Sequence, residues 1–287
     1  MATPSSALQR PLSSAQQGAF VADAEAEARF QARKQRLLWR RRLLPLAAAI
    51  LLVALWQFVV VYFGIRSFIA PSPLAVVYTL VDRFGILMAN LAPTALEALL
   101  GFAIGNLAAI ALATAFVHNK TVEEAFFPIV VLINTIPVVA KAPILVLLMG
   151  NGIEPKIAIA ALICFFPTLV NMTRGLSAVN PQTLELMRVL SASDREIFWK
   201  LRVYNSLPYL FSALKIAAST SVIGAIVAEW IGTTQGIGAL IIEATYKFDS
   251  PMLYATVTVG ASFSVAFFFV ITLIERLVVK WEPQGPV

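Results

Sequence analysis

The sequence predicts an all-α membrane protein with six membrane-spanning helices, and its composition and the distribution of its apolar residues support this prediction. Of the 287 residues, 59% are hydrophobic and 13% are charged, whereas soluble domains have about 45–50% apolar and about 25% charged residues. The apolar residues cluster in six segments, each near the ~20 residues that a helix needs to cross about 30 Å of hydrocarbon. The segments cover approximately residues 43–64, 90–116, 126–149, 157–174, 207–231 and 251–275.

The polar ends of the chain define its domain organisation. Residues 1–42 are hydrophilic and end in three consecutive arginines, so they are too long and too polar for a signal peptide. We interpret them as a cytoplasmic N-terminal tail, followed by one transmembrane domain over residues 43–280 and a cytoplasmic C-terminal tail over residues 281–287. A single Cys and a single His exclude a disulfide framework and a Cys- or His-rich metal site, so no metal and no catalytic residue are expected.

Lysine and arginine are distributed unequally between the two sides of the predicted bundle. With the N-terminus in the cytoplasm and counting from Arg29 onward, the cytoplasmic side carries fifteen of these residues: Arg29, Arg33, Lys34, Arg36, Arg40, Arg41, Arg42, Lys120, Arg174, Arg188, Arg195, Lys200, Arg202, Arg276 and Lys280. The outer side carries four: Arg66, Arg83, Lys156 and Lys247. This asymmetry satisfies the positive-inside rule and predicts that both termini are cytoplasmic. The net charge of +6 then reflects topology rather than binding to nucleic acid.

The longest internal polar segment, approximately residues 175–206, is predicted to form a cytoplasmic helical hairpin. Asn180 is suited to cap a helix that has Pro181 as its first residue, since proline has no N–H to lose there. Ser191-Ala192-Ser193 breaks that helix, and Ser193 with Glu196 forms the capping-box pattern that begins a second one. The hairpin carries apolar side chains into the cytosol, and such a surface usually has a protein partner.

Four ionisable residues lie inside the predicted spans: Glu97, Lys141, Lys215 and Glu229. Such residues are costly in lipid and generally face a bundle interior or a wet cavity. In the fifth span, Lys215, Ser219 and Glu229 fall within about 40° of one line on a helical wheel. These residues are therefore candidates to line a translocation pathway. Lys215 and Glu229 also lie near the ends of the span, from which they can instead snorkel to the interface.

Lys141 has two alternative interpretations. It lies roughly nine residues from the outer end of the third span, which is deep for snorkelling. Pro137 and Pro143 flank it and predict a kink. Glu97 lies at a similar depth. Lys141 and Glu97 therefore either form a buried structural pair, or Lys141 faces the pathway and favours an anionic substrate.

Glycine and proline mark shorter elements of the chain. Ser72-Pro73 predicts the start of a short outer helix that extends to about residue 84. Three glycines between residues 232 and 238 predict a flexible outer turn, and a second short helix is expected at about residues 239–247. Gly101 and Gly105 in the second span predict a face that packs closely on a neighbouring helix.

The predicted hairpin resembles the cytoplasmic EAA loop of binding-protein-dependent ABC importer permeases. The family pattern is Glu-Ala-Ala, three residues, Gly, nine residues and Ile-x-Leu-Pro. Its spacing matches Glu185-Leu186-Met187, Ser191 and Leu201-Arg202-Val203-Tyr204. Glu185 is retained, whereas Leu and Met replace the alanines, Ser replaces the Gly, and Val-Tyr replaces the Leu-Pro. In the family this loop docks in a groove of a cytosolic ATPase. The resemblance therefore implies that the following residues couple the chain to an ATPase: Glu185, Leu186, Met187, Leu190, Ser191 and Ser193.

Further landmarks resemble the branch of these permeases that imports nitrate, sulfonates, taurine and thiamine-pyrimidine precursors. They are Pro71-Ser72-Pro73, Gly101-Phe102, Ile136-Pro137, Gly150-Asn151-Gly152, Leu190-Ser191-Ala192-Ser193, the stretch from Val222 to Gly232, and Gly236-Ile237-Gly238. The resemblance covers about residues 43–280 and implies the type I ABC importer permease fold. It also implies that Gly236 and Gly238 belong to an external gate.

The resemblance implies a multi-pass protein of the bacterial plasma (inner) membrane that forms one half of a transport pathway. The expected partners are a second copy of the chain, a dimer of cytosolic ABC ATPases, a periplasmic or lipid-anchored solute-binding protein and the membrane lipid, with no nucleic acid. The chain has no Gly-x-x-x-x-Gly-Lys-Ser/Thr motif, so it is not expected to be an enzyme, and ATP and Mg²⁺ are expected in the ATPase. The solute is expected to be nitrate, bicarbonate, a sulfonate, taurine or a pyrimidine-type precursor.

The competing interpretation is an ion-coupled secondary transporter or channel that uses the four intramembrane charges. Inverted repeats and broken helices would support it, and the sequence shows no convincing internal repeat. Uptake driven by an ion gradient alone, without an ATPase, would favour this alternative.

Overall fold

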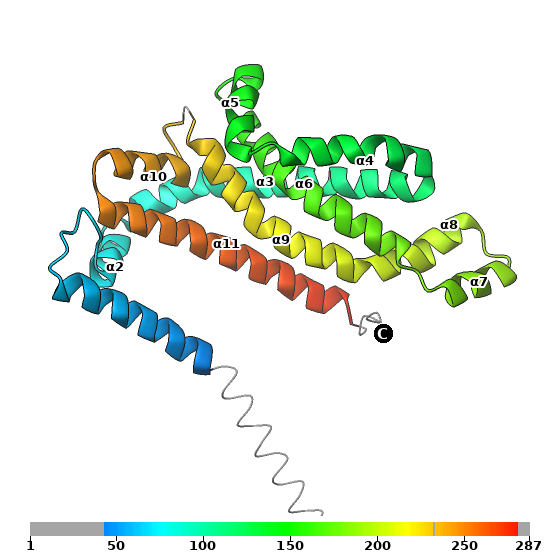
Figure 1. The fold of residues 1–287 in the computed structure, drawn as a ribbon, viewed down its shortest axis with the longest axis horizontal. Helices are drawn as coiled ribbons and strands as arrows, with labels where there is room; N and C mark the ends of the chain where they lie inside the picture. The colour runs from blue at the N-terminus through cyan, green and yellow to red at the C-terminus, as the bar shows by residue number, and fades with distance from the viewer. Residues whose placement is uncertain (1–42, 232, 281–287) are drawn as a thin grey trace, which may run out of the picture. The chain divides into compact units, whose positions relative to one another are not determined.

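The computed structural model describes residues 43–231 and 233–280, and the regular structure in these ranges is helical (Figure 1). The two predicted tails, residues 1–42 and 281–287, lie outside the described residues. The chain divides after Gly64 into two compact units. The prediction of an all-α membrane protein is confirmed.

The first unit contains one described helix, Leu43–Tyr62. Its 20 residues have a mean hydropathy of 2.5 in their most apolar window, and almost all of its large apolar side chains are exposed. A helix of this length and composition can cross a membrane with its side chains in contact with lipid.

The second unit contains the remaining helices. They are α2 (Pro73–Asp82), α3 (Phe84–His118), α4 (Lys120–Thr135), α5 (Val138–Met149), α6 (Glu154–Ser177), α7 (Pro181–Val189), α8 (Asp194–Ile197), the π-helix η1 (Phe198–Arg202), α9 (Val203–Glu229), α10 (Ile237–Tyr246) and α11 (Ser250–Val278). Among the described residues of both units, five helices are long and apolar enough to cross a membrane. The bent pair α4–α5 makes a sixth span if the two helices cross together.

Small residues bring the central helices α3, α6 and α9 together. A β-carbon added to Gly101 or Gly105 of α3 would overlap with Ala160 or Ala161 of α6, so these two helices approach almost to backbone contact. Gly224 of α9 packs in the same way on Ala160. The predicted glycine contact face is therefore confirmed, and such close approach is typical of helices that pack within a membrane. Helix α11 lies along α9 (Figure 1).

The third apolar segment, expected as one kinked span over residues 126–149, is divided into two helices. α4 and α5 meet at an angle of 100°. Ile136 and Pro137 separate them and have extended backbone conformations, with ψ angles of 126° and 139°. Proline disfavours helical geometry in the residue before it and cannot donate the next helical hydrogen bond. The expected kink is therefore a complete break.

The predicted helical hairpin is confirmed in its first arm and corrected in its second. α7 begins after Asn180, whose side chain accepts a hydrogen bond from the Gln182 N–H at 2.8 Å. Ser193 and Glu196 form the predicted capping box. The helix that begins there does not end before the fifth span, because α8, η1 and α9 form one continuous helix, Asp194–Glu229. The second arm is therefore the extension of a span and not a separate short helix.

The other short helices lie close to their predicted positions. α2 begins after Ser72, whose hydroxyl accepts a hydrogen bond from the Ala75 N–H at 3.2 Å. α10 begins at Ile237, two residues earlier than predicted, and α11 begins at Ser250 as expected. The Ser250 hydroxyl donates to the Phe68 carbonyl oxygen and so attaches the start of α11 to the segment that precedes α2.

Candidate functional site

Helix α7 projects at one end of the second unit, and its two ends are both closed by hydrogen bonds. At its carboxyl end the Ser191 N–H donates to the Arg188 carbonyl oxygen at 2.9 Å, and the Ala192 N–H donates to that of Met187 at 3.0 Å. This pair of bonds is the Schellman pattern, which requires a left-handed residue after the helix. Ser191 supplies that residue with φ of 57°, and the family pattern has glycine at this position.

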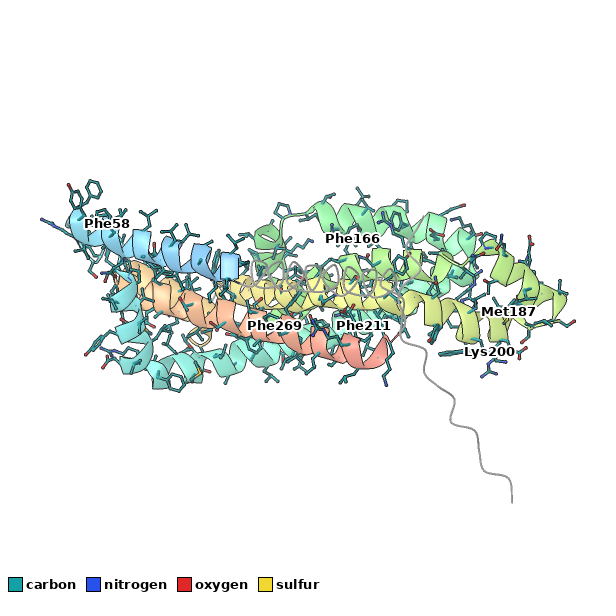
Figure 2. All side chains as sticks on the ribbon, turned by 90° about the horizontal axis from the view of Figure 1, so that it is seen from below. Phe58, Phe166, Met187, Lys200, Phe211 and Phe269 are labelled. Carbon is teal, nitrogen blue, oxygen red and sulfur yellow. The ribbon has the colours of Figure 1, made fainter. Side chains whose placement is uncertain are left out.

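Most side chains of α7 that were predicted to couple the chain to a partner are exposed. Leu186 and Leu190 are 58% and 69% exposed, Glu185 is exposed and Met187 is half-buried. Figure 2 shows Met187 and Lys200 at the same end of the bundle. The structure therefore places Glu185, Leu186 and Met187 on α7, whereas Leu190 and Ser191 follow its last turn and Ser193 caps the next helix.

The base of α7 is attached to the start of the long helix by polar contacts. The Arg202 guanidinium donates to the Leu176 carbonyl oxygen at 3.0 Å, and the Asn205 amide donates to the Ala178 carbonyl oxygen at 2.7 Å. A pocket of about 260 Å³ lies beside α7. Its lining consists of Val117, His118, Leu184, Arg188, Asp194, Ile197, Phe198 and Arg202. The segments on both sides of α7 are therefore fixed by hydrogen bonds, and a pocket remains open along one side of the helix.

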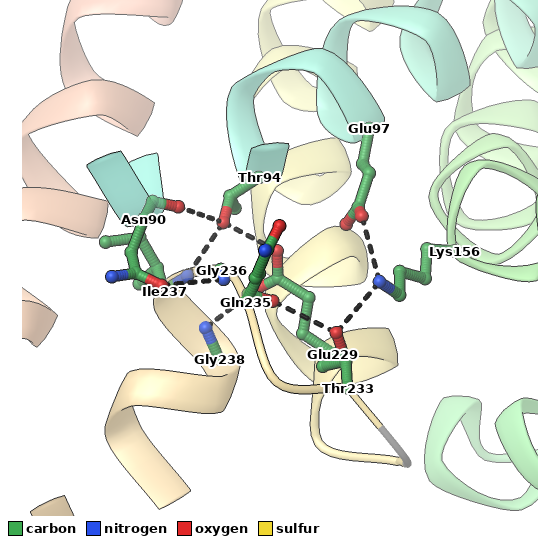
Figure 3. A network of polar contacts seen from close by, with 10 residues as sticks. All are labelled: Asn90, Thr94, Glu97, Lys156, Glu229, Thr233, Gln235, Gly236, Ile237 and Gly238. Carbon is green, nitrogen blue, oxygen red and sulfur yellow. Dashed lines mark hydrogen bonds and ion pairs between the residues drawn. The ribbon is translucent and has the colours of Figure 1, made fainter. Parts of the chain in front are cut away.

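A buried polar cluster lies at the opposite end of α9 (Figure 3). Glu229 is 1% exposed, and both oxygens of its carboxyl group accept short hydrogen bonds. The Thr94 hydroxyl of α3 donates to one oxygen at 2.6 Å, and the Gly238 N–H of α10 donates to the other at 2.6 Å. Glu229 thus joins three helices at a point where α9 ends.

The N-terminus of α10 depends on this cluster, because Gly236 at its N-cap position has no side chain to cap it. The Ile237 N–H donates to the Thr94 hydroxyl oxygen at 2.8 Å, and the Gly236 N–H donates to the Asn90 amide oxygen at 3.0 Å. With the Gly238 bond to Glu229, three successive N–H groups are satisfied by side chains of α3 and α9. A carboxylate at a helix N-terminus is also favoured by the helix dipole.

The two predicted gate glycines fit closely against Glu229. Gly236 has φ of 112°, a backbone conformation that disfavours L side chains. A β-carbon at Gly236 would overlap with the Glu229 carboxyl group, and one at Gly238 would overlap with the Ile226 carbonyl oxygen. The cluster therefore requires glycine at both positions.

Glu97 pairs with Lys156 and not with Lys141. The Lys156 ammonium at the start of α6 lies 3.2 Å from the Glu97 carboxyl group and donates to the Thr233 hydroxyl at 3.0 Å. Glu97 is 1% exposed and Lys156 is 9% exposed. The predicted Lys141–Glu97 pair is therefore wrong: the break at residues 136–137 turns α5 away, and α6 supplies the cation instead.

Lys156 is a residue that the sequence analysis missed. It was assigned to an outer loop because it precedes the apolar segment at residues 157–174. The structure places it in the first turn of α6, directly after Pro155 at a position where proline often begins a helix. That proline was the available signal that the helix begins early enough to include the lysine.

The remaining candidate pathway residues lie apart from this cluster. The Lys215 ammonium pairs with the Glu275 carboxyl group of α11 at 2.9 Å. Lys141 is half-buried on α5, and no ion pair or hydrogen bond of its ammonium is formed with the residues that the structure describes. Ser219 is half-buried on α9. The structure therefore brings Glu97 and Glu229 together and leaves Lys141, Lys215 and Ser219 at separate places.

The family of the chain follows from comparison with known proteins. Residues 101–281 match the family model described as binding-protein-dependent transport system inner membrane component. This match covers more than half of the sequence, so the chain belongs to that family. It is a multi-pass inner membrane protein and the permease subunit of an ABC importer. This membership decides against an ion-coupled secondary transporter.

Relatives with this fold and chain length are transport permeases. The chain is 32% identical over 241 residues to the formylaminopyrimidine transport permease protein ThiX of Halalkalibacterium halodurans, covering 84% of this chain and 96% of the relative. It is 31% identical to the riboflavin transport system permease protein RibX of Chloroflexus aurantiacus, with coverage of 86% and 93%. It is 26% identical to the putative aliphatic sulfonates permease SsuC of Bacillus subtilis, with coverage of 87% and 90%.

Solved structures show the same fold. A chain of the MetNI methionine ABC transporter in an inward-facing conformation superimposes with a TM-score of 0.55 at 18% identity. The alignment covers 73% of this chain and 99% of that chain. The predicted type I importer permease fold is confirmed.

Proposed function

We propose that the permease is driven by a separate cytosolic ABC ATPase that docks on α7. The observation that carries the proposal is a capped helix with exposed apolar residues, joined by residues 190–193 to the 36-residue helix Asp194–Glu229. Leu186 and Leu190 supply the apolar contact surface and Glu185 a charge beside it. A rigid, capped helix transmits a displacement better than a flexible loop does.

The orientation follows from the distribution of positive charge. Among the described residues, Arg188, Arg195, Lys200 and Arg202 lie on α7 or on the helix that begins after it. The positive-inside rule then places α7 and both termini in the cytoplasm. α2 and α10 accordingly lie on the outer side, where a periplasmic or lipid-anchored solute-binding protein delivers the solute.

Two copies of the chain form the complete pathway. One chain supplies half of a transmembrane pathway, and a symmetric pair closes it around a shared axis. Glu97 and Lys215 form ion pairs within the chain, and Glu229 forms hydrogen bonds within it. We therefore assign these three residues a structural role in the helix bundle. Lys141 and Ser219 remain the candidates to line the pathway.

The solute is a small molecule whose identity is set mainly by the binding protein. Among the relatives described above, those with 32% and 31% identity are named for formylaminopyrimidine and riboflavin, and the one with 26% identity is named for aliphatic sulfonates. We therefore favour a heteroaromatic vitamin or pyrimidine-type precursor over nitrate, bicarbonate or a sulfonate.

Transport then proceeds by alternating access. ATP with Mg²⁺ binds in the ATPase dimer and closes it, and the two α7 helices are drawn together. Each long helix Asp194–Glu229 moves with its α7 and opens the pathway to the outside, and hydrolysis returns it. The permease itself contributes docking, transmission and the walls of the pathway, and no bond chemistry.

A charge reversal on α7 tests this proposal. Glu185→Arg should abolish ATP-driven uptake in proteoliposomes that contain the permease, its ATPase and its binding protein. Membrane insertion and yield should remain normal, because Glu185 is exposed and forms no ion pair with the residues that the structure describes. Glu243→Arg on α10 is the matched control, since Glu243 is also an exposed helical glutamate, and it should retain uptake. Normal uptake in Glu185→Arg would reject α7 as the docking element.

A further inference from the structure

One helix links the proposed docking end to the buried polar cluster. The continuous helix Asp194–Glu229 has 36 residues, which corresponds to about 54 Å at 1.5 Å per residue. Ser193 caps it beside α7, and Glu229 is its last residue. A displacement of α7 is therefore carried along the whole helix to Glu229.

The Glu229 carboxyl group is a polar contact between this helix and α10, beside the close approach of Gly238 to the Ile226 carbonyl oxygen. It accepts from Gly238 N–H in the first turn of α10 and from Thr94 Oγ–H of α3, both at 2.6 Å. Both bonds are short, and Glu229 is 1% exposed. A buried carboxyl group that loses its hydrogen-bond partners incurs a large desolvation penalty. The first turn of α10 therefore moves with Glu229 unless another donor replaces the Gly238 N–H.

Three successive N–H groups at the start of α10, from its N-cap residue Gly236 to Gly238, donate to the side chains of Asn90, Thr94 and Glu229. Asn90 and Thr94 both belong to α3, so Glu229 is the side chain from the long helix in this set.

We propose that Glu229 is a positioning residue that makes α10 move with the long helix, through a clasp formed by Thr94, Glu229 and Gly238. This inference rests on the proposed ATPase drive and deepens it, because it assigns the transmission of movement to one side chain at the outer end. The long helix transmits the displacement of α7, and the clasp passes it to α10 and to the turn at residues 233–236.

The first test measures whether Glu229 holds α10 and requires no ATPase. Glu229→Gln retains the size of the side chain but places an amide NH₂ against either the Gly238 N–H or the Thr94 hydroxyl. Hydrogen exchange of a peptide that covers residues 233–246 should become about tenfold faster, a factor that corresponds to about 1.4 kcal/mol. Glu243→Gln is the control, because Glu243 bonds only to the exposed Lys247 on the same helix, and exchange should be unchanged. Unchanged exchange in Glu229→Gln would overturn the proposal.

The second test measures transmission in the complete importer with its ATPase and binding protein. Glu229→Gln should lower the amount of solute transported per ATP hydrolysed by about tenfold, which again corresponds to about 1.4 kcal/mol. Asn90→Ala removes an attachment of α10 to α3 that does not involve α9, and it should keep the wild-type ratio. An equal ratio in both variants would show that Glu229 has only a structural role and would overturn the proposal.

Failure of the clasp can be distinguished both from a variant that does not fold and from failure of the proposed function. If Glu229→Gln does not insert, Thr94→Val removes the hydroxyl that donates to Glu229 and accepts from the Ile237 N–H, and Thr94→Ser should restore both bonds because it keeps the hydroxyl. Faster exchange in Thr94→Val but not in Thr94→Ser supports the clasp, and equal exchange in the two rejects it. ATP-independent uptake by the wild-type complex would reject the ATPase drive, while the exchange result would still decide whether the clasp holds α10.

Discussion

Lys156 illustrates how far the role of a single residue can be inferred from its position in the sequence. The sequence singled out Glu97 and Glu229 as costly charges within the spans and as candidates to line the pathway, and the structure shows both to be buried. The cation that pairs with Glu97 was not identified, since Lys141 lies at the expected depth only if the third span is straight. The partner depends on the break at residues 136–137 and on the first turn of α6, and both are properties of three-dimensional packing.

The Glu97–Lys156 pair leads to a prediction for a double-mutant cycle. Lys156→Met leaves a buried carboxylate without its cation and should lower the free energy of unfolding by about 3–5 kcal/mol. Adding Glu97→Leu should recover most of that loss, because both charges are then removed. Thermal stability of the purified protein is the measurement. Lys141→Met with Glu97→Leu is the control pair, and it should show no such recovery. Recovery in that pair would contradict the pairing seen here.

Ser191 leads to a prediction in the stabilising direction. Its φ of 57° is left-handed, and this conformation costs an L residue about 1–2 kcal/mol that glycine does not incur. Ser191→Gly should therefore stabilise the end of α7 by about 1 kcal/mol, measured by slower hydrogen exchange of residues 181–192. Ser193→Ala removes the cap of the next helix and should have the opposite effect, with a loss of about 1 kcal/mol. Destabilisation by Ser191→Gly would contradict the Schellman end.

At the scale of elements, the helix starts with a side-chain cap were predictable and helix continuity was not. Asn180, Ser193 and Ser72 cap the helices that the sequence assigns to them, because capping involves residues within one turn. The fusion of the hairpin arm with the fifth span passes through the π-helix Phe198–Arg202, and a single turn of this kind leaves no local sequence signal. The break between α4 and α5 shows the same limit, since Pro137 predicts a kink but not its angle.

The contact between α3 and α6 leads to a prediction at this scale. Gly105→Ala places a β-carbon against the backbone of Ala161, which cannot rotate away, so the variant should lose about 1–3 kcal/mol of stability by overpacking. Gly85→Ala on the same helix is the matched control. No atom lies within 4 Å of its added β-carbon, and the substitution should be neutral or should stabilise by up to about 1 kcal/mol. Equal effects of the two substitutions on thermal unfolding would contradict the packing.

At the scale of the whole molecule, the membrane character, the apolar segments and the family pattern were all present in the sequence. Glu185 and Ser191 carry the EAA spacing, and the structure places Glu185 on the exposed helix α7 and Ser191 at the turn that ends it. The arrangement of the polar cluster required the fold, because its residues come from α3, α6, α9 and α10. No pairwise spacing in the sequence links Asn90 to Gly236 or Thr94 to Glu229.

The proposed orientation predicts which end of the molecule is accessible from outside the cell. Cysteines introduced singly at Tyr78 of α2 and at Leu190 of α7 replace side chains that are 72% and 69% exposed. In intact cells a membrane-impermeant thiol reagent should label the first and not the second. The native Cys164 is buried and donates to a carbonyl oxygen, so background labelling should be small. Labelling at position 190 without permeabilisation would invert the topology.

The most direct test of the central claim, that α7 is the docking element for the ATPase, is a site-specific photocrosslink in the assembled importer. A photoreactive residue in place of Leu186 on α7 should yield a covalent product with the ATPase subunit. The same residue in place of Tyr246 on α10, which is also strongly exposed, should yield none with the ATPase. A product with the ATPase from position 246 and none from position 186 would contradict the account.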